Sequence, residues 1–237
     1  MCSRYEKQLL LPEVGTEGQR RLTASRVAVV GAGGLGSPVL YALVSAGIGF
    51  IRIVDSDAVE ISNLNRQFLH VESDIGRAKS LSAKEKLERY NSAICVEAIA
   101  ARLDEENARE LLADCDLVVS CVDNKQARQL MNRVCVRENI ALIDGGVQGF
   151  EGYVLTVLPG VTPCRACVFP NGKEDKSVGV LGAAAGVIGS LMAVEAFKHL
   201  VGIPIDSYFH YVDGLGFRLT PLKAEKLTDC PVCGDLR

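Results

Sequence analysis

Concentrated charge is absent from this sequence. The 237 residues carry a formal net charge of −3, and no run of five like charges occurs. Binding to nucleic acid or to an anionic membrane depends on clustered positive charge, so neither class of partner is indicated. The N-terminal segment Met1-Cys-Ser-Arg-Tyr-Glu-Lys7 also lacks the apolar core of a secretory signal, which predicts a cytoplasmic location. Soluble partners are therefore favoured.

Histidine is scarce as well. The chain has three histidines, and only His70 lies near the polar motifs described below. We interpret His70 as structural or peripheral, so any activity would have to proceed without a histidine general base. The 48% hydrophobic content and the length are sufficient to bury a full core, and they favour one α/β domain.

Nine cysteines are present, and a reducing compartment makes metal binding or catalysis more common for such residues than structural disulfides. Two pairs, Cys164-Arg-Ala-Cys167 and Cys230-Pro-Val-Cys233, have the spacing of zinc knuckles and predict one structural zinc site with four cysteine ligands. A redox function of one C-x-x-C pair is the alternative. The remaining cysteines are interpreted as buried or incidental thiols: Cys2, Cys95, Cys115, Cys121 and Cys135.

One uncharged apolar segment, residues 178–194, requires a membrane check. It is shorter than the roughly 20 apolar residues that a transmembrane helix needs, and Glu195, Lys198 and His199 follow it directly. Its glycines would permit close helix packing in lipid. We expect instead a buried helix of a soluble core.

Apolar strand patterns and helical patterns alternate along the first 144 residues, which predicts a doubly wound, mainly parallel, Rossmann-like α/β sheet. Strands are predicted at 27–30, 51–54, 94–99, 117–120 and 141–144, and helices at 35–45, 79–90, 105–112 and 124–138. Gly145-Gly146 is expected to end this alternation. Segments 152–158 and 207–212 are predicted as antiparallel strands, joined across a long crossover at 159–176.

A glycine-rich turn follows the first predicted strand. Gly31-Ala-Gly33-Gly34-Leu-Gly36 would let backbone N–H groups approach a phosphate, and Asp55 falls 19 residues after Gly36, where a ribose hydroxyl would be met. Such a turn by itself is equally consistent with NAD(P) or flavin binding and with ATP binding.

The polar residues that follow the turn favour chemistry at phosphorus. Asn63, Arg66 and Gln67 form one short cluster, and Lys79 comes soon after them. A solvated surface is the alternative interpretation for the cations. Hydride transfer gains little from two additional cations, whereas displacement at phosphorus requires neutralisation of negative charge. Phosphoryl or nucleotidyl transfer is therefore predicted. Asp123 is predicted to hold Mg²⁺, although it could instead, or in addition, be the N-cap of the helix that starts at Asn124.

The sequence resembles the ThiF/HesA/MoeB family, the bacterial relatives of the ubiquitin-activating enzymes, over nearly its whole length. The shared motifs are Arg4-Tyr-x-x-Gln8, Gly31-x-Gly-Gly-Leu-Gly36, Asp55-x-Asp57, Ser62-Asn-Leu-x-Arg-Gln67, Ile75-Gly-x-x-Lys79, Asp123-Asn124, Gly149-Phe-Glu-Gly152, Cys164-x-x-Cys167, Gly179-Val-Leu-Gly182, Gly186-Val-Ile-Gly-Ser190 and Cys230-Pro-x-Cys233.

The resemblance implies ATP-dependent adenylation of the C-terminal glycine carboxylate of a small ubiquitin-like sulfur-carrier protein ending in Gly-Gly, with release of pyrophosphate. It implies that Asp55 holds the ATP ribose, that Asn63, Arg66 and Lys79 hold the phosphates, and that Asp123 holds Mg²⁺. The remaining members of the predicted nucleotide site are Gly31, Gly33, Gly34, Gly36, Asp57, Gln67 and Asn124. A homodimer and a sulfurtransferase partner are also expected.

Two positions depart from the family pattern. Relatives typically place a cysteine four residues before Gly179, where this chain has Asp175, which predicts a reaction that stops at the adenylate. Lys7 stands where relatives often have an arginine that reaches the ATP of the neighbouring subunit. Lysine keeps the charge and loses the planar fork, so either Lys7 or Arg4 could fill that catalytic role.

The predicted organisation is a single adenylation domain with three parts, a helical arm at 1–25, a nucleotide-binding core at 26–150 and a carrier-binding and zinc region at 151–237. Other carboxylates remain as alternative acceptors, namely a peptide terminus or a modified tRNA base, and the lack of a basic stripe disfavours tRNA. An NAD(P)-dependent oxidoreductase and a non-catalytic carrier-binding scaffold are further alternatives.

Overall fold

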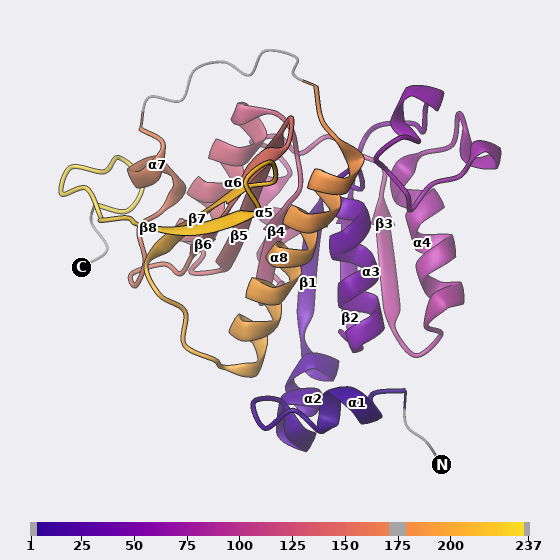
Figure 1. Cartoon of the computed structure of the whole chain (residues 1–237), viewed down its shortest axis with the longest axis horizontal. Coiled ribbons are helices and arrows are strands. Elements are labelled where there is room, and N and C mark those ends of the chain that lie inside the picture. Colours follow the sequence, from indigo (N-terminus) through magenta and orange to yellow (C-terminus); the bar gives the residue numbers. More distant parts are fainter. Residues whose placement is uncertain (1–3, 171–178, 235–237) are drawn as a thin grey trace.

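The computed structural model describes residues 4–170 and 179–234. Its centre is one eight-stranded sheet with the strand order β3-β2-β1-β4-β5-β6-β7-β8 (Figure 1). The strands are β1 Arg26–Val30, β2 Phe50–Val54, β3 Cys95–Ile99, β4 Leu117–Ser120, β5 Ala141–Gln148, β6 Glu151–Val157, β7 Tyr208–Asp213 and β8 Arg218–Lys223. Strands β1 to β5 pair in parallel and β5 to β8 pair antiparallel, so the predicted fold class is confirmed.

Helices cover both faces of the parallel half, as the continuous apolar strands require. On one face, α3 Gly36–Ala46, α4 Lys79–Tyr90 and α8 Gly182–Val201 pack on inward side chains such as Val29, Ile53 and Ile143. On the other face, α5 Ala108–Leu112, α6 Lys125–Arg137 and the short α7 Arg165–Val168 pack on the alternate positions of the same strands. Because successive side chains of each strand point to opposite faces of the sheet, each strand contributes to two separate hydrophobic cores.

Helix α8 is, among the described residues, the one helix long and apolar enough to cross a membrane by length and composition. In the structure its apolar face lies against α3 and β5, and Ile188 and Met192 are buried in the core. A Cβ at Gly189 would lie 2.4 Å from Pro38 Cγ of α3, so the glycine permits close packing of these two helices. Gly189 therefore serves protein packing, and the helix runs further than residue 194, to Val201, with Gly202 as its C-cap in the left-handed region.

Strand β5 does not end at the glycine pair, which corrects the predicted boundary at residue 144. Gly145 and Gly146 continue the strand and pair with Val154 and Tyr153 of β6. A Cβ at Gly145 would meet Met192 Sδ at 2.2 Å, and one at Gly146 would meet the Tyr153 ring at 2.3 Å. These glycines make room for neighbouring side chains. Strand β8 was not predicted, because its residues are exposed along the sheet edge and carry no apolar alternation.

The N-terminal arm contains α1 Glu6–Leu9 and α2 Gly15–Ala24, at the end of the sheet where β1 begins (Figure 1). Tyr5 packs against Gly47, the C-cap of α3, and accepts a hydrogen bond of 3.1 Å from Asn91 Nδ2. Lys7 lies on exposed α1, at the opposite end of α3 from the glycine turn. Within one chain Lys7 does not join the other predicted site residues.

Short 3-10 turns at Ile61–Asn63 and Glu72–Asp74 connect β2 to α4. The predicted crossover contains α7 and then passes through residues 171–178, which lie outside the described residues, so Asp175 has no structural account here.

Candidate active site and metal centre

The glycine turn joins β1 to α3 at the carboxyl end of the parallel strands, the edge at which doubly wound sheets bind ligands. Two of its glycines are demanded by the fold. Gly31 has φ +98°, and a Cβ there would lie 2.7 Å from the Cys121 carbonyl oxygen, while a Cβ at Gly36 would lie 2.0 Å from the Gly31 carbonyl oxygen. Gly33 and Gly34 are different, because added Cβ atoms would meet neighbours only at 3.4 and 3.5 Å. An added methyl group at either position would be in ordinary van der Waals contact with its neighbours, and a glycine there lets a phosphate approach the backbone closely.

Asp55 lies at the end of β2, directly beside this turn. Its Oδ2 accepts a hydrogen bond of 2.7 Å from the Ala32 N–H, and its Oδ1 accepts one of 2.8 Å from the Asp57 N–H. Burial raises the pKa of the Asp55 carboxyl above its ordinary value, against the opposing effect of these two bonds and of the Lys79 charge. The site therefore holds a desolvated acceptor, which ribose hydroxyl donors would satisfy.

Lys79 opens α4 with its side chain only 7% exposed, and its ammonium forms an ion pair of 2.9 Å with Asp57 Oδ2. The Asp57 side chain is 67% exposed, so water can replace the lysine as its partner. The carboxylate of this half-buried pair is solvated, which limits the free energy lost when the two groups separate. Lys79 is therefore a buried cation that can exchange its partner for a phosphate at small cost.

The segment that follows β2 presents a second cation. Arg66 is half-buried, and its Nη1 donates hydrogen bonds of 2.9 Å to the Ser62 carbonyl and to Asn65 Oδ1. Both acceptors are neutral. Asn63, for which contact with phosphate stays a prediction, closes the 3-10 turn with its Oδ1, which accepts from the Glu60 N–H at 3.1 Å. Its Nδ2 lies 3.4 Å from Ser62 Oγ.

Gln67 is buried against the glycine turn, with its Nε2 3.4 Å from the Cβ position of Gly33. Its Oε1 has no hydrogen-bond partner among the described residues. A buried, unsatisfied acceptor costs free energy, and a ligand donor would relieve that cost. The empty acceptor beside the glycine turn fits a bound nucleotide that offers a hydrogen-bond donor.

His70 is structural, which is one of the two alternatives in its interpretation. Its Nε2 lies 2.9 Å from the carbonyl oxygen of Ala32 in the glycine turn, and its Nδ1 lies 2.9 Å from Ser82 Oγ of α4. Because a carbonyl can only accept, Nε2 carries the proton. Burial lowers the pKa of His70 and favours this neutral form. The imidazole connects the glycine turn to α4. The sequence signal that could have indicated this role is the position of His70, three residues after Gln67.

Asp123 is exposed after β4, and it is Asn124 that caps α6, its Oδ1 accepting from the Ala127 N–H at 2.9 Å. The N-cap alternative for Asp123 is therefore wrong. Asn124 uses its side-chain oxygen in the cap, whereas the Asp123 carboxylate remains on the same edge of the sheet as Asp55 and the glycine turn. An exposed carboxylate at this edge is a suitable oxygen ligand for Mg²⁺.

The four predicted zinc ligands converge on one point. The sulfur atoms of Cys164, Cys167, Cys230 and Cys233 all lie within 4.8 Å of one another, with pairs at 3.5, 3.6 and 3.9 Å. Tetrahedral zinc with bonds of about 2.3 Å requires sulfur separations of roughly 3.8 Å. All four residues are buried. This four-cysteine centre fits a closed zinc site that joins the crossover to the C-terminal tail.

Nitrogen donors surround the four-cysteine centre, as expected around thiolates. Asn132 Nδ2 lies 3.6 Å from Cys164 Sγ, and the Leu227 N–H lies 3.4 Å from Cys167 Sγ. Cysteine binds a metal as the thiolate, and N–H donors at these distances stabilise that form.

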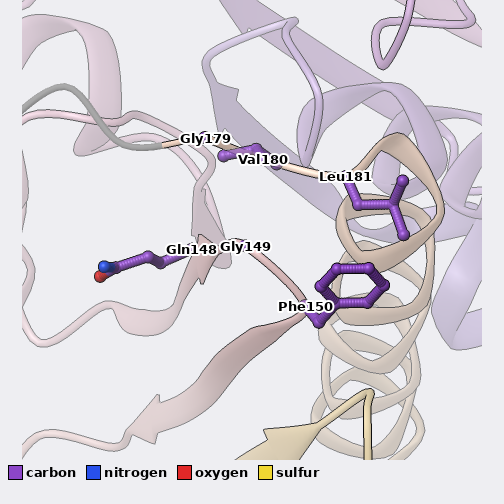
Figure 2. Close-up of a pocket in the computed structure, with 6 residues that line it drawn as sticks. All are labelled: Gln148, Gly149, Phe150, Gly179, Val180 and Leu181. Carbon is purple, nitrogen blue, oxygen red and sulfur yellow. The ribbon is translucent and has the colours of Figure 1, made fainter.

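A crevice of about 560 Å³ runs between the β5–β6 turn and the segment before α8 (Figure 2). The two segments are bonded backbone to backbone, with Gly149 N–H donating to the Gly179 carbonyl at 2.7 Å and Leu181 N–H donating to the Gly149 carbonyl at 3.1 Å. Phe150 and Leu181 lie on one side of the crevice and Gln148 on the other. The adjoining Gly182 packs on Arg66, so the crevice leads to the edge of the sheet that carries the glycine turn, Asp55 and Lys79, which we call the nucleotide edge.

Comparison with known proteins decides the family. The model of the ThiF family matches residues 5–232. The chain belongs to the ThiF family. Among its relatives, the "Sulfur carrier protein adenylyltransferase" of Thermus thermophilus is 42% identical and aligns over 98% of this chain and 90% of its own length. The "SAMP-activating enzyme E1" of Haloferax volcanii is 40% identical, over 98% and 88% respectively.

The fold of this ThiF family member also matches solved structures. Escherichia coli MccB, crystallised with MccA-N7isoASN, superposes with a TM-score of 0.88 at 24% sequence identity, covering 98% of this chain and 74% of that chain. At that identity the likeness concerns the fold alone. It includes the change from parallel to antiparallel strands on which the site described above is built.

Proposed function

We propose that this protein uses ATP to adenylate the C-terminal glycine carboxylate of a ubiquitin-like sulfur-carrier protein. One observation carries the proposal. Two cations, Lys79 with an exchangeable partner and Arg66 with neutral partners, flank a glycine turn whose backbone a phosphate can approach closely. Family membership supports the same conclusion, because a 42% identical relative is named as a sulfur carrier protein adenylyltransferase.

The proposed reaction needs no general base, because a carboxylate is already ionised at neutral pH. One carboxylate oxygen of the carrier attacks the α-phosphorus of ATP. The new P–O bond forms as the bond to the bridging oxygen breaks, and pyrophosphate leaves with the electron pair. Arg66 and Lys79 stabilise the charge that develops on the phosphates, and Asp55 orients the ribose. The scarcity of histidine is consistent with this chemistry.

Two metal ions belong to the proposal. Mg²⁺, which Asp123 would hold, would supply further charge neutralisation at the phosphates. Zinc at the four-cysteine centre would be structural, since four thiolate ligands leave no open position. A cytoplasmic location would keep these thiols reduced for metal binding, and it stands as part of the proposal.

The carrier tail is proposed to approach along the crevice lined by Phe150, Val180 and Leu181, beside the point where Gly149 bonds to Gly179 and Leu181. Two glycines and three apolar residues in the lining suit an extended Gly-Gly terminus. Sulfur would then come from a separate sulfurtransferase. This order is proposed because Asp175 occupies the position of the family thiol.

A homodimer is also proposed. Phe68, Val187 and Val194 are about half exposed, at 51%, 53% and 50%, and Phe68 packs beside Gly186 on α8. Apolar side chains grouped on one face indicate a protein contact. In such a dimer Lys7, which lies far from the site of its own chain, would be available to the site of the partner.

The proposal is tested by ATP–pyrophosphate exchange with a panel of acceptors. We expect exchange with a ubiquitin-like carrier ending in Gly-Gly, and none with the same carrier lacking its last glycine. Peptide termini, modified tRNA and NADH serve as the comparison arms. ATP binding without exchange for any carrier would refute the proposal, and exchange with a peptide alone would transfer it to that substrate class.

A further inference from the structure

A buried cluster of charged side chains lies between the four-cysteine centre and the loop that carries Asp123. Asp144 of β5 is fully buried, and Arg128 of α6 and Arg165 of α7 are 6% and 8% exposed. Arg128 Nη1 donates to Asp144 Oδ1 at 2.9 Å, and Arg165 Nε donates to Asp144 Oδ2 at 3.0 Å. The Tyr153 hydroxyl donates to the same Oδ2 at 2.9 Å. Asp144 thus bridges two helices through its two oxygens.

At one end, the cluster is bonded to the cysteine centre. Arg165 lies between Cys164 and Cys167 in sequence, and its backbone N–H donates to Asn132 Oδ1 at 2.8 Å. Asn132 in turn approaches Cys164 Sγ through Nδ2 at 3.6 Å. The position of α7 is therefore set jointly by the sulfur atoms and by Asp144.

At the other end, the cluster is bonded to the predicted magnesium loop. Arg128 Nη2 donates to the carbonyl of Val122, and its Nη1 donates to the carbonyl of Gly145. The Val122 carbonyl belongs to the peptide unit that begins Asp123. Arg128 consequently fixes the backbone from which the Asp123 side chain projects.

The charges of the two regions are complementary. Arg165 is a buried cation within the Cys164–Cys167 segment. Four thiolates around one divalent zinc ion carry a net charge of roughly −2. A zinc-loaded centre would therefore attract the guanidinium that lies next to it. Burial and the Asp144 carboxylate raise the pKa of Tyr153 to about 12, so its hydroxyl remains a donor.

We propose that Arg165, Asp144 and Arg128 form a chain of positioning residues through which the zinc centre holds Asp123 in place for the nucleotide reaction. The inference rests on the proposed nucleotide role of Asp123. It assigns to the four-cysteine centre a second task besides folding. The roles assigned to Arg165, Asp144 and Arg128 involve no contact with substrate. These three residues act through Asp123 and are positioning residues, not catalytic residues.

Hydrogen exchange of the full-length, zinc-loaded protein tests this series of three positioning residues without any activity measurement. In Arg165→Met, backbone amides of residues 122–128 should exchange about tenfold faster, since coupling of this kind is typically worth a factor of this order. Amides of residues 53–57 should be unchanged, and bound zinc should stay at one per chain. Arg165→Lys should restore part of the protection. Arg109→Met, which breaks an exposed pair with Glu138, is the matched control.

Unchanged exchange at residues 122–128 in a zinc-loaded Arg165→Met protein would overturn the inference. Should that variant not fold, Tyr153→Phe removes only the hydroxyl that donates to Asp144 and accepts from Arg128 Nη1 at 3.0 Å. It should still accelerate exchange at residues 122–128 about threefold, as the loss of side-chain hydrogen bonds can. The same protection in Tyr153→Phe and in wild type would likewise overturn the inference.

The activity arm measures the Mg²⁺ concentration for half-maximal ATP–pyrophosphate exchange. Arg165→Met should raise it about fivefold or more, while KM for the carrier is unchanged. An unaltered Mg²⁺ response would overturn the link to Asp123. If wild type itself shows no exchange, the proposed function fails, and the hydrogen-exchange result still decides whether the chain of contacts exists.

Discussion

The nucleotide edge and the four-cysteine centre are assembled in opposite ways. At the nucleotide edge, Lys79 pairs with an exposed partner, Gln67 Oε1 has none among the described residues, and Gly33 and Gly34 present backbone without a side chain. At the four-cysteine centre, the sulfurs are buried, close together and approached by N–H donors. Groups that must change partners during a reaction are left exchangeable, whereas groups that hold the fold are enclosed. Substitutions at the two sites should therefore affect different properties, stability at the four-cysteine centre and activity at the nucleotide edge.

The largest effect is expected at the closed centre. Cys167→Ser removes one thiolate, so zinc should be lost, and the free energy of unfolding should fall by several kcal/mol because metal binding is coupled to folding. Metal analysis and chemical denaturation measure this. Cys95→Ser, at an exposed cysteine, is the control and should leave both quantities unchanged. Wild-type stability in a zinc-free Cys167→Ser protein would contradict a structural role.

Lys79→Ala should separate activity from stability at the open edge. We expect pyrophosphate exchange to fall about 100-fold or more, as when one preorganised charge is removed from a reaction centre. Stability should change by less than about 1 kcal/mol, because Asp57 remains solvated. Lys84→Ala on the same helix, which breaks a pair with Glu88, should retain activity. Equal exchange rates for Lys79→Ala and wild type would remove Lys79 from the mechanism.

Two glycines of one turn provide an internal comparison. Gly36→Ala would place a Cβ 2.0 Å from the Gly31 carbonyl oxygen, so we expect a destabilisation of about 1–3 kcal/mol. Gly33→Ala should fold within about 0.5 kcal/mol of wild type and bind ATP about tenfold more weakly, because its methyl group enters the phosphate space. Calorimetric titration and denaturation measure the pair. Normal ATP affinity in Gly33→Ala would place the phosphates elsewhere.

The smallest effect concerns the strut at His70. Its folded pKa lies below the ordinary value of 6.5, so the unfolded chain binds the proton more readily. The contribution of neutral His70 is therefore complete above about pH 6.5 and is lost as the pH falls toward the folded pKa. His70→Gln should cost about 1 kcal/mol or less at neutral pH, the value of one hydrogen bond, and should reduce the acid-side slope.

Denaturation at several pH values between about 5 and 8, the range in which histidine titrates, measures the His70 slope. Burial also lowers the pKa of His199, so wild type carries two contributions of the same sign. His199→Gln is the control that isolates the second one. A slope unchanged by His70→Gln would show that His70 does not titrate on unfolding.

The sequence predicted the parallel half of the sheet well, because each strand there is a short apolar run that ends at a polar or glycine residue. Asp55, Asp123 and the glycine turn could be placed at one edge for the same reason. Prediction was wrong where glycine has a packing role, as at Gly145, which gives way to Met192 rather than ending a strand. Strand β8 has no apolar alternation to identify it.

Contacts between residues far apart in sequence could not be predicted from local sequence patterns. The strut from His70 to Ala32 and the bridge at Asp144 depend on how helices pack on the two faces of the sheet. Local spacing does report the cysteine pairs, because each pair lies within one turn. It does not report which charged side chains are buried beside them.

The central claim, adenylation of a carrier without a covalent enzyme intermediate, is tested most directly by intact-mass spectrometry. Protein, Mg²⁺, ATP and a carrier ending in Gly-Gly are mixed without a sulfur donor and quenched in acid. The account predicts a carrier heavier by one adenylate and an enzyme of unchanged mass. An unmodified carrier, or an enzyme–carrier adduct that is released by thiol, would contradict it.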